Sequence, residues 1–180
     1  MAGSLEFIKS ASGTSVSSLS VTDCFSANYD VYKIVGHTAE YLPVDATDAI
    51  DLRIQFIDSG GSIISDSEYD TARLTMKAEA SFDSDRQTNI AYMYGSVLVG
   101  NYQNGGAVLY VFNPTNSSSY TFMLGQGASG YETSANKFRS AKQIGVLKQT
   151  SSITGINFVS PSASNDFKAD IKVFGLRVDS

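Results

Sequence analysis

One histidine, His37, and one cysteine, Cys24, are the side chains in this sequence best suited to nucleophilic catalysis or metal binding. A catalytic triad or a zinc site needs several such groups together, because the base, the orienting group and the other ligands must all be supplied. We therefore expect neither site. Cys24 cannot form an intramolecular disulfide, and we expect it to be a small buried hydrophobic residue. His37 is predicted to lie in a loop or at a sheet edge, where the alternating pattern before it ends.

A glycine pattern of the dinucleotide-binding type occurs at Gly125-Gln126-Gly127-Ala128-Ser129-Gly130. In such sites the glycines join a strand to a helix that faces a pyrophosphate, and an acidic residue about 20 positions later binds the ribose. No βαβ pattern precedes this segment, and no Asp or Glu occurs between Glu132 and Asp166. We interpret residues 125–130 as a loop and predict no cofactor.

Carboxylates gather in three places that could hold calcium or an acid/base pair. They are Asp45, Asp48 and Asp51, then Asp66, Glu68 and Asp70, and then Asp83 and Asp85. Calcium takes about six to eight oxygens from a wrapped loop, and a glycosidase needs one carboxyl group in a partly apolar cleft. The sequence indicates neither arrangement, so no catalytic or metal-binding residue is predicted. Structural or adventitious calcium on these loops remains an alternative.

Aromatic and amide side chains in the predicted loops could form a sugar-binding platform. These are Tyr102, Gln103, Asn104, Gln126 and Tyr131. The chain has no tryptophan, the strongest stacking residue. Ordinary turn residues beside half-buried tyrosines are therefore the simpler interpretation.

The overall composition disfavours nucleic-acid and membrane partners. The formal net charge is -5, the sequence pI is about 4.7, and the basic residues are scattered singly. A polyanion would meet a repelling surface. No apolar run approaches the ~20 residues that cross a bilayer, and the N-terminal residues lack the pattern of a signal peptide. We expect the chain to be made and kept in a cytoplasm-like compartment until something releases it.

The apolar residues repeat with a period of two, which is typical of half-buried strands. The strongest runs are residues 29–35, 51–58 and 107–112, and weaker ones are 5–9, 16–21, 71–79, 90–94, 97–99, 120–124, 144–148, 153–158 and 171–178. Ten Tyr and ten Phe suit pleated surfaces. With 180 residues and 42% hydrophobic residues, we predict one domain, residues 1–180, folded as an antiparallel, jelly-roll-like β-sandwich.

Turns and helices are predicted from what interrupts this alternation. Residues 59–62 contain two adjacent glycines and read as a hairpin turn. The segments 10–20, 100–106, 116–119 and 125–130 read as loops. The best helical pattern is residues 133–143, so at most one or two short helices are expected.

Several segments resemble small virion structural proteins of tailed phages, especially marine and cyanobacterial ones. They are Leu5-Glu6-Phe7-Ile8-Lys9-Ser10, Val21-Thr22-Asp23-Cys24-Phe25-Ser26, Tyr29-Asp30-Val31-Tyr32-Lys33-Ile34-Val35, Leu52-Arg53-Ile54-Gln55-Phe56-Ile57-Asp58-Ser59-Gly60, Phe112-Asn113-Pro114, Ser119-Tyr120-Thr121-Phe122, Ile153-Thr154-Gly155-Ile156-Asn157-Phe158 and Ile171-Lys172-Val173-Phe174-Gly175-Leu176. The resemblance implies a β-sandwich on the particle, as a capsid decoration or as a tail or fibre component. These motifs are strand and turn patterns, so no functional residue is carried over.

The expected function is therefore contact within a virion and not catalysis. The partners would be capsid or tail subunits, and the resemblance implies symmetric copies, so we expect a homo-oligomer, with a trimer as one arrangement. The alternative is a receptor- or carbohydrate-binding module on the same particle, with a host surface glycan as ligand. A hydrolase with its site in the loops is the third and weakest hypothesis.

Overall fold

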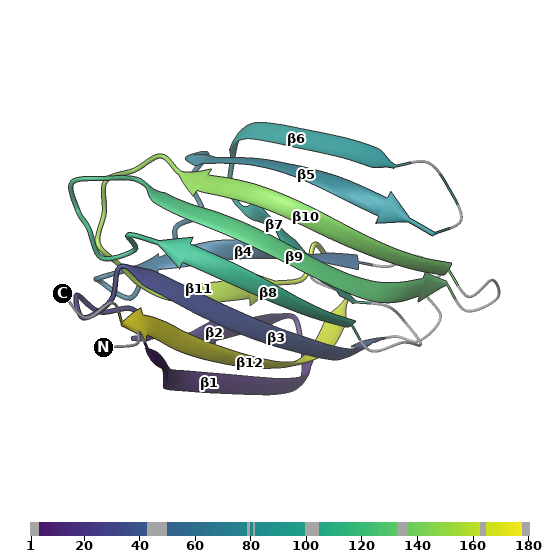
Figure 1. The fold of residues 1–180 in the computed structure, drawn as a ribbon, viewed down its shortest axis with the longest axis horizontal. Coiled ribbons are helices and arrows are strands. Elements are labelled where there is room, and N and C mark those ends of the chain that lie inside the picture. Colours follow the sequence, from purple (N-terminus) through teal and green to yellow (C-terminus); the bar gives the residue numbers. More distant parts are fainter. Residues whose placement is uncertain are drawn as a thin grey trace.

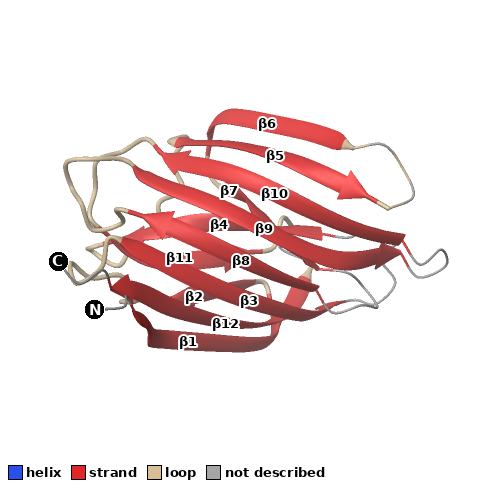
Figure 2. Cartoon of the chain, in the orientation of Figure 1, coloured by secondary structure: helices blue, strands red, loops and turns tan. Residues whose placement is uncertain are grey.

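The computed structural model is described here for residues 4–42, 50–78, 80, 82–99, 105–132, 137–162 and 165–177. Every regular element in these ranges is a β-strand (Figure 2). Two antiparallel sheets face each other, which confirms the predicted β-sandwich. The described residues contain no helix long and apolar enough to cross a membrane.

The larger sheet has eight strands, and in Figure 1 it lies in front of the smaller one. In spatial order they are β1 (Ser4–Val16), β12 (Asp166–Arg177), β3 (Val31–Leu42), β8 (Gly105–Phe112), β9 (Thr121–Glu132), β10 (Lys137–Leu147), β5 (Tyr69–Lys77) and β6 (Asp83–Ile90). Strands from both ends of the sequence thus lie side by side, with β1 and β6 at the two edges.

The smaller sheet has four strands. In spatial order they are β2 (Ser18–Val21), β11 (Ile153–Val159), β4 (Ile50–Asp58) and β7 (Met93–Val99). The strongest predicted run, residues 51–58, forms most of β4, and its Leu52, Ile54 and Phe56 are buried as the alternation requires.

The core fills the space between the two sheets. Its largest fully buried side chains include Tyr32, Tyr69, Phe56, Phe158 and Phe167. Tyr69 shows how such a ring is accommodated, because its hydroxyl donates to the carbonyl of Ile64 at 3.0 Å and accepts from the amide of Phe56 at 3.0 Å. A buried tyrosine needs this pairing, since an unmade hydrogen bond costs about 1–3 kcal/mol.

The predicted hairpin turn after β4 is confirmed. Gly61 has φ 83°, and Asp58 accepts hydrogen bonds from the amides of Gly60 at 2.8 Å and Ser62 at 2.9 Å. The chain then returns beside β4 through a bridge between Ile57 and Ile63. One glycine at positive φ and one aspartate cap therefore make this reversal.

Several predicted boundaries are wrong. The best helical candidate, residues 133–143, runs into β10, whose central part alternates Ala141, Gln143 and Gly145 inward. Residues 90–94 are not one strand, because β6 ends at Ile90 and β7 begins at Met93. β6 itself was not predicted, since its sequence, Asp83 to Ile90, is almost entirely polar. Pairing with β5 along one edge, not burial, holds it in place.

Two predicted loops and one predicted edge residue are strands in the structure. Residues 10–16 belong to β1 and residues 18–20 to β2, and residues 125–130 belong to β9. His37 lies within β3, which pairs on both sides with β12 and β8, so it is neither in a loop nor at an edge. Small residues are tolerated in these strands because their neighbours supply the packing.

Gly95 of β7 occupies a bulge against β4. The pairing passes from Asp51 with Leu98 to Arg53 with Tyr94, so β7 carries extra residues there. A Cβ at Gly95 would lie 2.2 Å from the carbonyl oxygen of Leu52, a backbone atom that cannot move aside. Glycine is therefore required at this close approach of two backbones.

Replacing Gly95 with alanine is expected to lower the free energy of unfolding by about 2–3 kcal/mol, because the strands must separate. Gly106→Ala is the matched control, since the nearest atom to its Cβ is the Gly36 carbonyl oxygen at 3.4 Å. Urea unfolding followed by circular dichroism measures both variants. Equal midpoints for the two would show that the bulge does not constrain residue 95.

Candidate interaction surface

The outer face of the larger sheet, which points away from the smaller sheet, is apolar over much of its extent. Side chains alternate along each strand, so those next to buried residues point outward. On β8, for example, Ala107, Leu109 and Val111 are buried while Tyr110 and Phe112 turn outward.

Cross-strand pairing aligns these outward residues in rows. One row runs through Leu5, Leu176, Val31, Phe112, Phe122 and Val146. The next runs through Phe7, Phe174, Lys33, Tyr110, Leu124 and Ile144, and continues to Ala72 and Arg86. We call the apolar members of these rows on β1, β12, β3, β8, β9 and β10 the apolar band.

The apolar band is open to solvent. Phe7 is 59% exposed, Ile144 58% and Phe122 48%. Six strands at ~4.8 Å spacing and two rows at ~7 Å give a footprint of roughly 400 Å². A contiguous patch of this size on a monomer is often functional.

Cations that form no ion pair with any described residue lie in and beside the band. Lys33 stands in the second row between Phe174 and Tyr110, and Lys142 and Lys172 occupy the row beyond it. In the described part of the chain, none of these three lysines forms an ion pair. The outer face thus combines the apolar band with lysines, and the exposed carboxylate of Asp170 lies beside Lys172 on β12.

Asp70, a carboxylate at the end of the first row, is already engaged. Its Oδ1 lies 2.9 Å from Nζ of Lys148 and accepts from the amide of Asn89 at 2.9 Å. The hydrogen bond from Lys148 is the largest cause that lowers the pKa of Asp70, and the Asn89 amide adds to it. This charge does not offset the free cations of the outer face.

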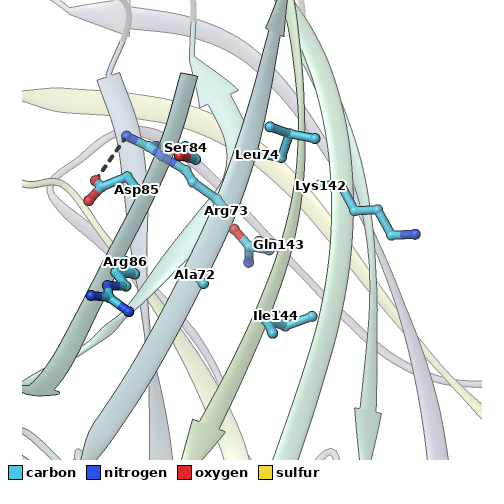
Figure 3. Close-up of a pocket in the computed structure, with 9 residues that line it drawn as sticks. All are labelled: Ala72, Arg73, Leu74, Ser84, Asp85, Arg86, Lys142, Gln143 and Ile144. Atoms are coloured by element: carbon cyan, nitrogen blue, oxygen red, sulfur yellow. Dashed lines mark ion pairs between the residues drawn. The ribbon is translucent and has the colours of Figure 1, made fainter. Parts of the chain in front are cut away.

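Two adjoining hollows lie over β9, β10, β5 and β6, with volumes of about 630 Å³ and 530 Å³. They share Ala72, Arg86 and Ile144. Figure 3 shows Arg86 on β6, Ala72 and Leu74 on β5, and Lys142 and Ile144 on β10. A third hollow, of about 450 Å³, is lined by residues of β1, β12 and β3, including His37, Asp170 and Lys172.

The opposite side of β5 and β6 carries a charged cluster that ties the two sheets together. Arg73 of β5 forms ion pairs with Asp51 of β4 and, at 3.8 Å, with Asp85 of β6, the latter marked in Figure 3. Arg139 of β10 lies 3.6 Å from Asp51. Tyr94 of β7 donates to Asp85 at 2.6 Å, and the Arg73 guanidinium lies over its ring.

The pKa values in this cluster follow from burial and pairing. Burial lowers the pKa of Arg73 most strongly, while burial and the hydrogen bond to Asp85 raise that of Tyr94. Two of the carboxylates considered as acid/base candidates, Asp51 and Asp85, are therefore held by cations. Asp45 and Asp48 lie outside the described residues.

The residues of the predicted sugar platform are only partly described. Gln126 is exposed on the outer face, next to Lys142 across the strand pair. Tyr131 lies in β9, and residues 102–104 are outside the described ranges. No group of three or more His, Cys, Asp or Glu residues within those ranges is placed to hold a metal ion.

Sequence reasoning missed the outer-face rows, although a signal was present. Residues 107–112 are apolar at every position, so both faces of that strand had to be apolar. In segments 122–124 and 144–146 the outward residues are likewise apolar. Only the pairing of these strands shows that their outward residues are neighbours.

Comparisons with known proteins leave the family open. No family model matches the chain, and no curated protein does. Among solved structures, it is similar to a marine PL-14 alginate lyase from Aplysia kurodai, with TM-score 0.39, 10% identity, and coverage of 87% of this chain and 72% of that one. A fructofuranosidase from Schwanniomyces occidentalis gives TM-score 0.29 and 8% identity, covering 97% of this chain and 34% of that one. A structure of infectious bursal disease virus, Gx strain, gives TM-score 0.14 and 9% identity, covering 97% and 36%.

Cys24 is buried, as predicted, and its thiol lies 3.2 Å from the carbonyl of Val21. Burial raises the pKa of this thiol to about 12. Because the thiolate is the reactive form, the native protein should react with an aromatic disulfide reagent at pH 8 at least about 100-fold more slowly than the urea-unfolded chain. Absorbance of the released thiolate measures both rates. Similar rates would show that Cys24 is accessible in the native fold.

Proposed function

We propose that this chain is a non-enzymatic structural protein of a phage particle, which decorates or stabilises the capsid or tail through the outer face of its larger sheet. The observation that carries the proposal is the apolar band, whose exposed members include Phe122 and Ile144. The phage setting is supported by the resemblance of its strand and turn segments to small virion structural proteins.

The apolar band is too small to hold the chain on a particle by itself, so we expect it to be one of several contacts. Covering roughly 400 Å² of apolar surface contributes on the order of 10 kcal/mol at ~25 cal/mol per Å². Losing translational and rotational freedom on association costs about 4–15 kcal/mol. The band alone therefore only about balances the cost of association. Further contacts beside it, or many symmetric copies on one particle, make the attachment firm.

A receptor- or carbohydrate-binding module on the same particle is the second candidate. Gln126, exposed beside Lys142 on the outer face, is the described side chain that favours it. Amide and ammonium groups satisfy sugar hydroxyls and acidic groups. The row that contains Gln126, Lys142 and Lys172 runs beside the apolar band and is not part of it.

The test is to purify the chain, determine its oligomeric state by light scattering, and measure its addition to particles that lack it, to host cells and to glycans. Addition to particles alone supports the structural role. Saturable binding to cells or glycans overturns it in favour of the binding module. Binding to none of the three contradicts both candidates.

The double variant Phe122→Ser and Ile144→Ser is expected to reduce addition to particles at least about tenfold, because interface anchors of this kind each contribute more than about 1 kcal/mol. Both side chains are exposed, so the urea midpoint should change little. Ile63→Ser, at a 43% exposed residue outside the outer face, is the matched control. Equal loss in the control variant would count against a role for the band.

A further inference from the structure

The two hollows over β5 form one groove. The groove exists because a small residue, Ala72, lies between larger side chains on the neighbouring strands. In the second row Ala72 stands between Ile144 on one side and Arg86 on the other. Figure 3 shows the longer side chains on the flanking strands and the single methyl group of Ala72 between them. We call this feature the Ala72 groove.

One half of the Ala72 groove is apolar. The hollow of about 530 Å³ has apolar walls on β8, β9 and β10, and its β5 and β6 side carries Asp70, which is paired with Lys148, and Arg86. The apolar walls are Phe112, Phe122, Leu124, Ile144 and Val146. The hollow is continuous with the apolar band, because all five residues are also members of the band. Aliphatic and aromatic side chains fit such walls, whereas sugar hydroxyls buried there would lose their hydrogen bonds.

The other half is cationic. Arg86 lines both hollows and Lys142 lines the larger one. Within the described residues neither forms an ion pair, while Asp85, a carboxylate that also lines the larger hollow, pairs with Arg73 and accepts from Tyr94. Two free cations beside an apolar hollow complement a carboxylate next to an apolar side chain.

We propose that the Ala72 groove binds an extended segment of a partner protein, whose apolar side chain enters the hollow at Phe122 and Ile144 and whose Asp or Glu pairs with Arg86. The inference rests on the proposed contact function and names the chemistry of the partner. Ile144 and Arg86 lie two strand spacings apart, ~9.5 Å, which corresponds to about two to three residues of extended chain.

A second copy of this chain docked face to face would add cations to the contact. Each of the two outer faces would bring Lys33, Lys142 and Lys172, which form no ion pair among the described residues. Like charges in a desolvated contact are unfavourable, and each unpaired ammonium would be costly to bury. A partner with carboxylates removes both costs.

The experiment is a selection of displayed random 12-residue peptides on the purified chain, with subtraction on the variant Ala72→Phe, which fills the groove. Enriched peptides should carry Asp or Glu two or three residues from Leu, Ile or Phe. By fluorescence anisotropy, Arg86→Glu should weaken the best peptide at least about tenfold, and 0.5 M salt should weaken it further. Lys168→Gln, on β12, is the control and should change affinity less than about twofold.

Circular dichroism and the urea midpoint verify that Ala72→Phe folds, and the exposed Arg86→Glu variant tests the site independently of that. No enrichment over the subtracted variant, enrichment of basic or neutral peptides, or unchanged affinity in Arg86→Glu would each overturn the proposal. Self-association of the wild-type chain that Ala72→Phe abolishes would assign the groove to a second copy and also overturn it.

The particle assay separates this inference from the proposed function. If wild-type chain adds to particles and the Phe122 and Ile144 double variant does not, the contact function stands. If the Ala72→Phe and Arg86→Glu variants add to particles to the same extent as the wild-type chain, the particle contact does not use an acidic partner segment in the Ala72 groove. If wild-type chain does not add at all, the proposed function fails whatever the peptides show.

Discussion

The alternation of side chains along a strand ties the outer surface of this protein to its core. Once Ile34, Leu109 and Val173 are buried between the sheets, their neighbours along β3, β8 and β12 must point outward. A slip of one residue would exchange the two faces of a strand. The rows of the apolar band therefore follow from the same pairing that builds the core, and the band is as well ordered as the sheet that carries it.

The same alternation separates two kinds of charge on β5 and β6. Arg73 and Asp85 turn inward, where pairing with Asp51 and Tyr94 offsets the cost of removing them from water. Arg86 is one residue further along β6 and faces outward, where it forms no ion pair with any other residue that the structure describes. An inward charge has to be satisfied within the chain, but an outward one is free to meet another molecule. Arg86 is therefore a candidate for binding because it points outward, whereas Arg73 carries the same charge but points inward and is paired.

An exposed apolar face is a liability for a protein that stays unassembled. Lys33 within the band and the lysines next to it keep the face hydrated and repel a second identical face. The same lysines would favour the partner proposed above, which brings carboxylates as well as apolar side chains.

The sequence by itself determined the period of two, and with it the class of fold. Residues 51–58 show this directly, since Leu52, Ile54 and Phe56 are buried as their spacing predicts. It also determined that Cys24 is buried and that residues 59–62 form a turn.

Where the alternating pattern was weak, strand pairing decided the structure instead. β6 is polar and is held by β5, residues 137–143 join β10 despite a helical spacing, and residues 125–130 continue β9 despite their glycines. The apolar band and the Ala72 groove are likewise products of tertiary structure. Period two is local and can be read within one strand, but neighbours across a sheet are set by long-range register, which joins Leu5 to Leu176 and Ala72 to Ile144.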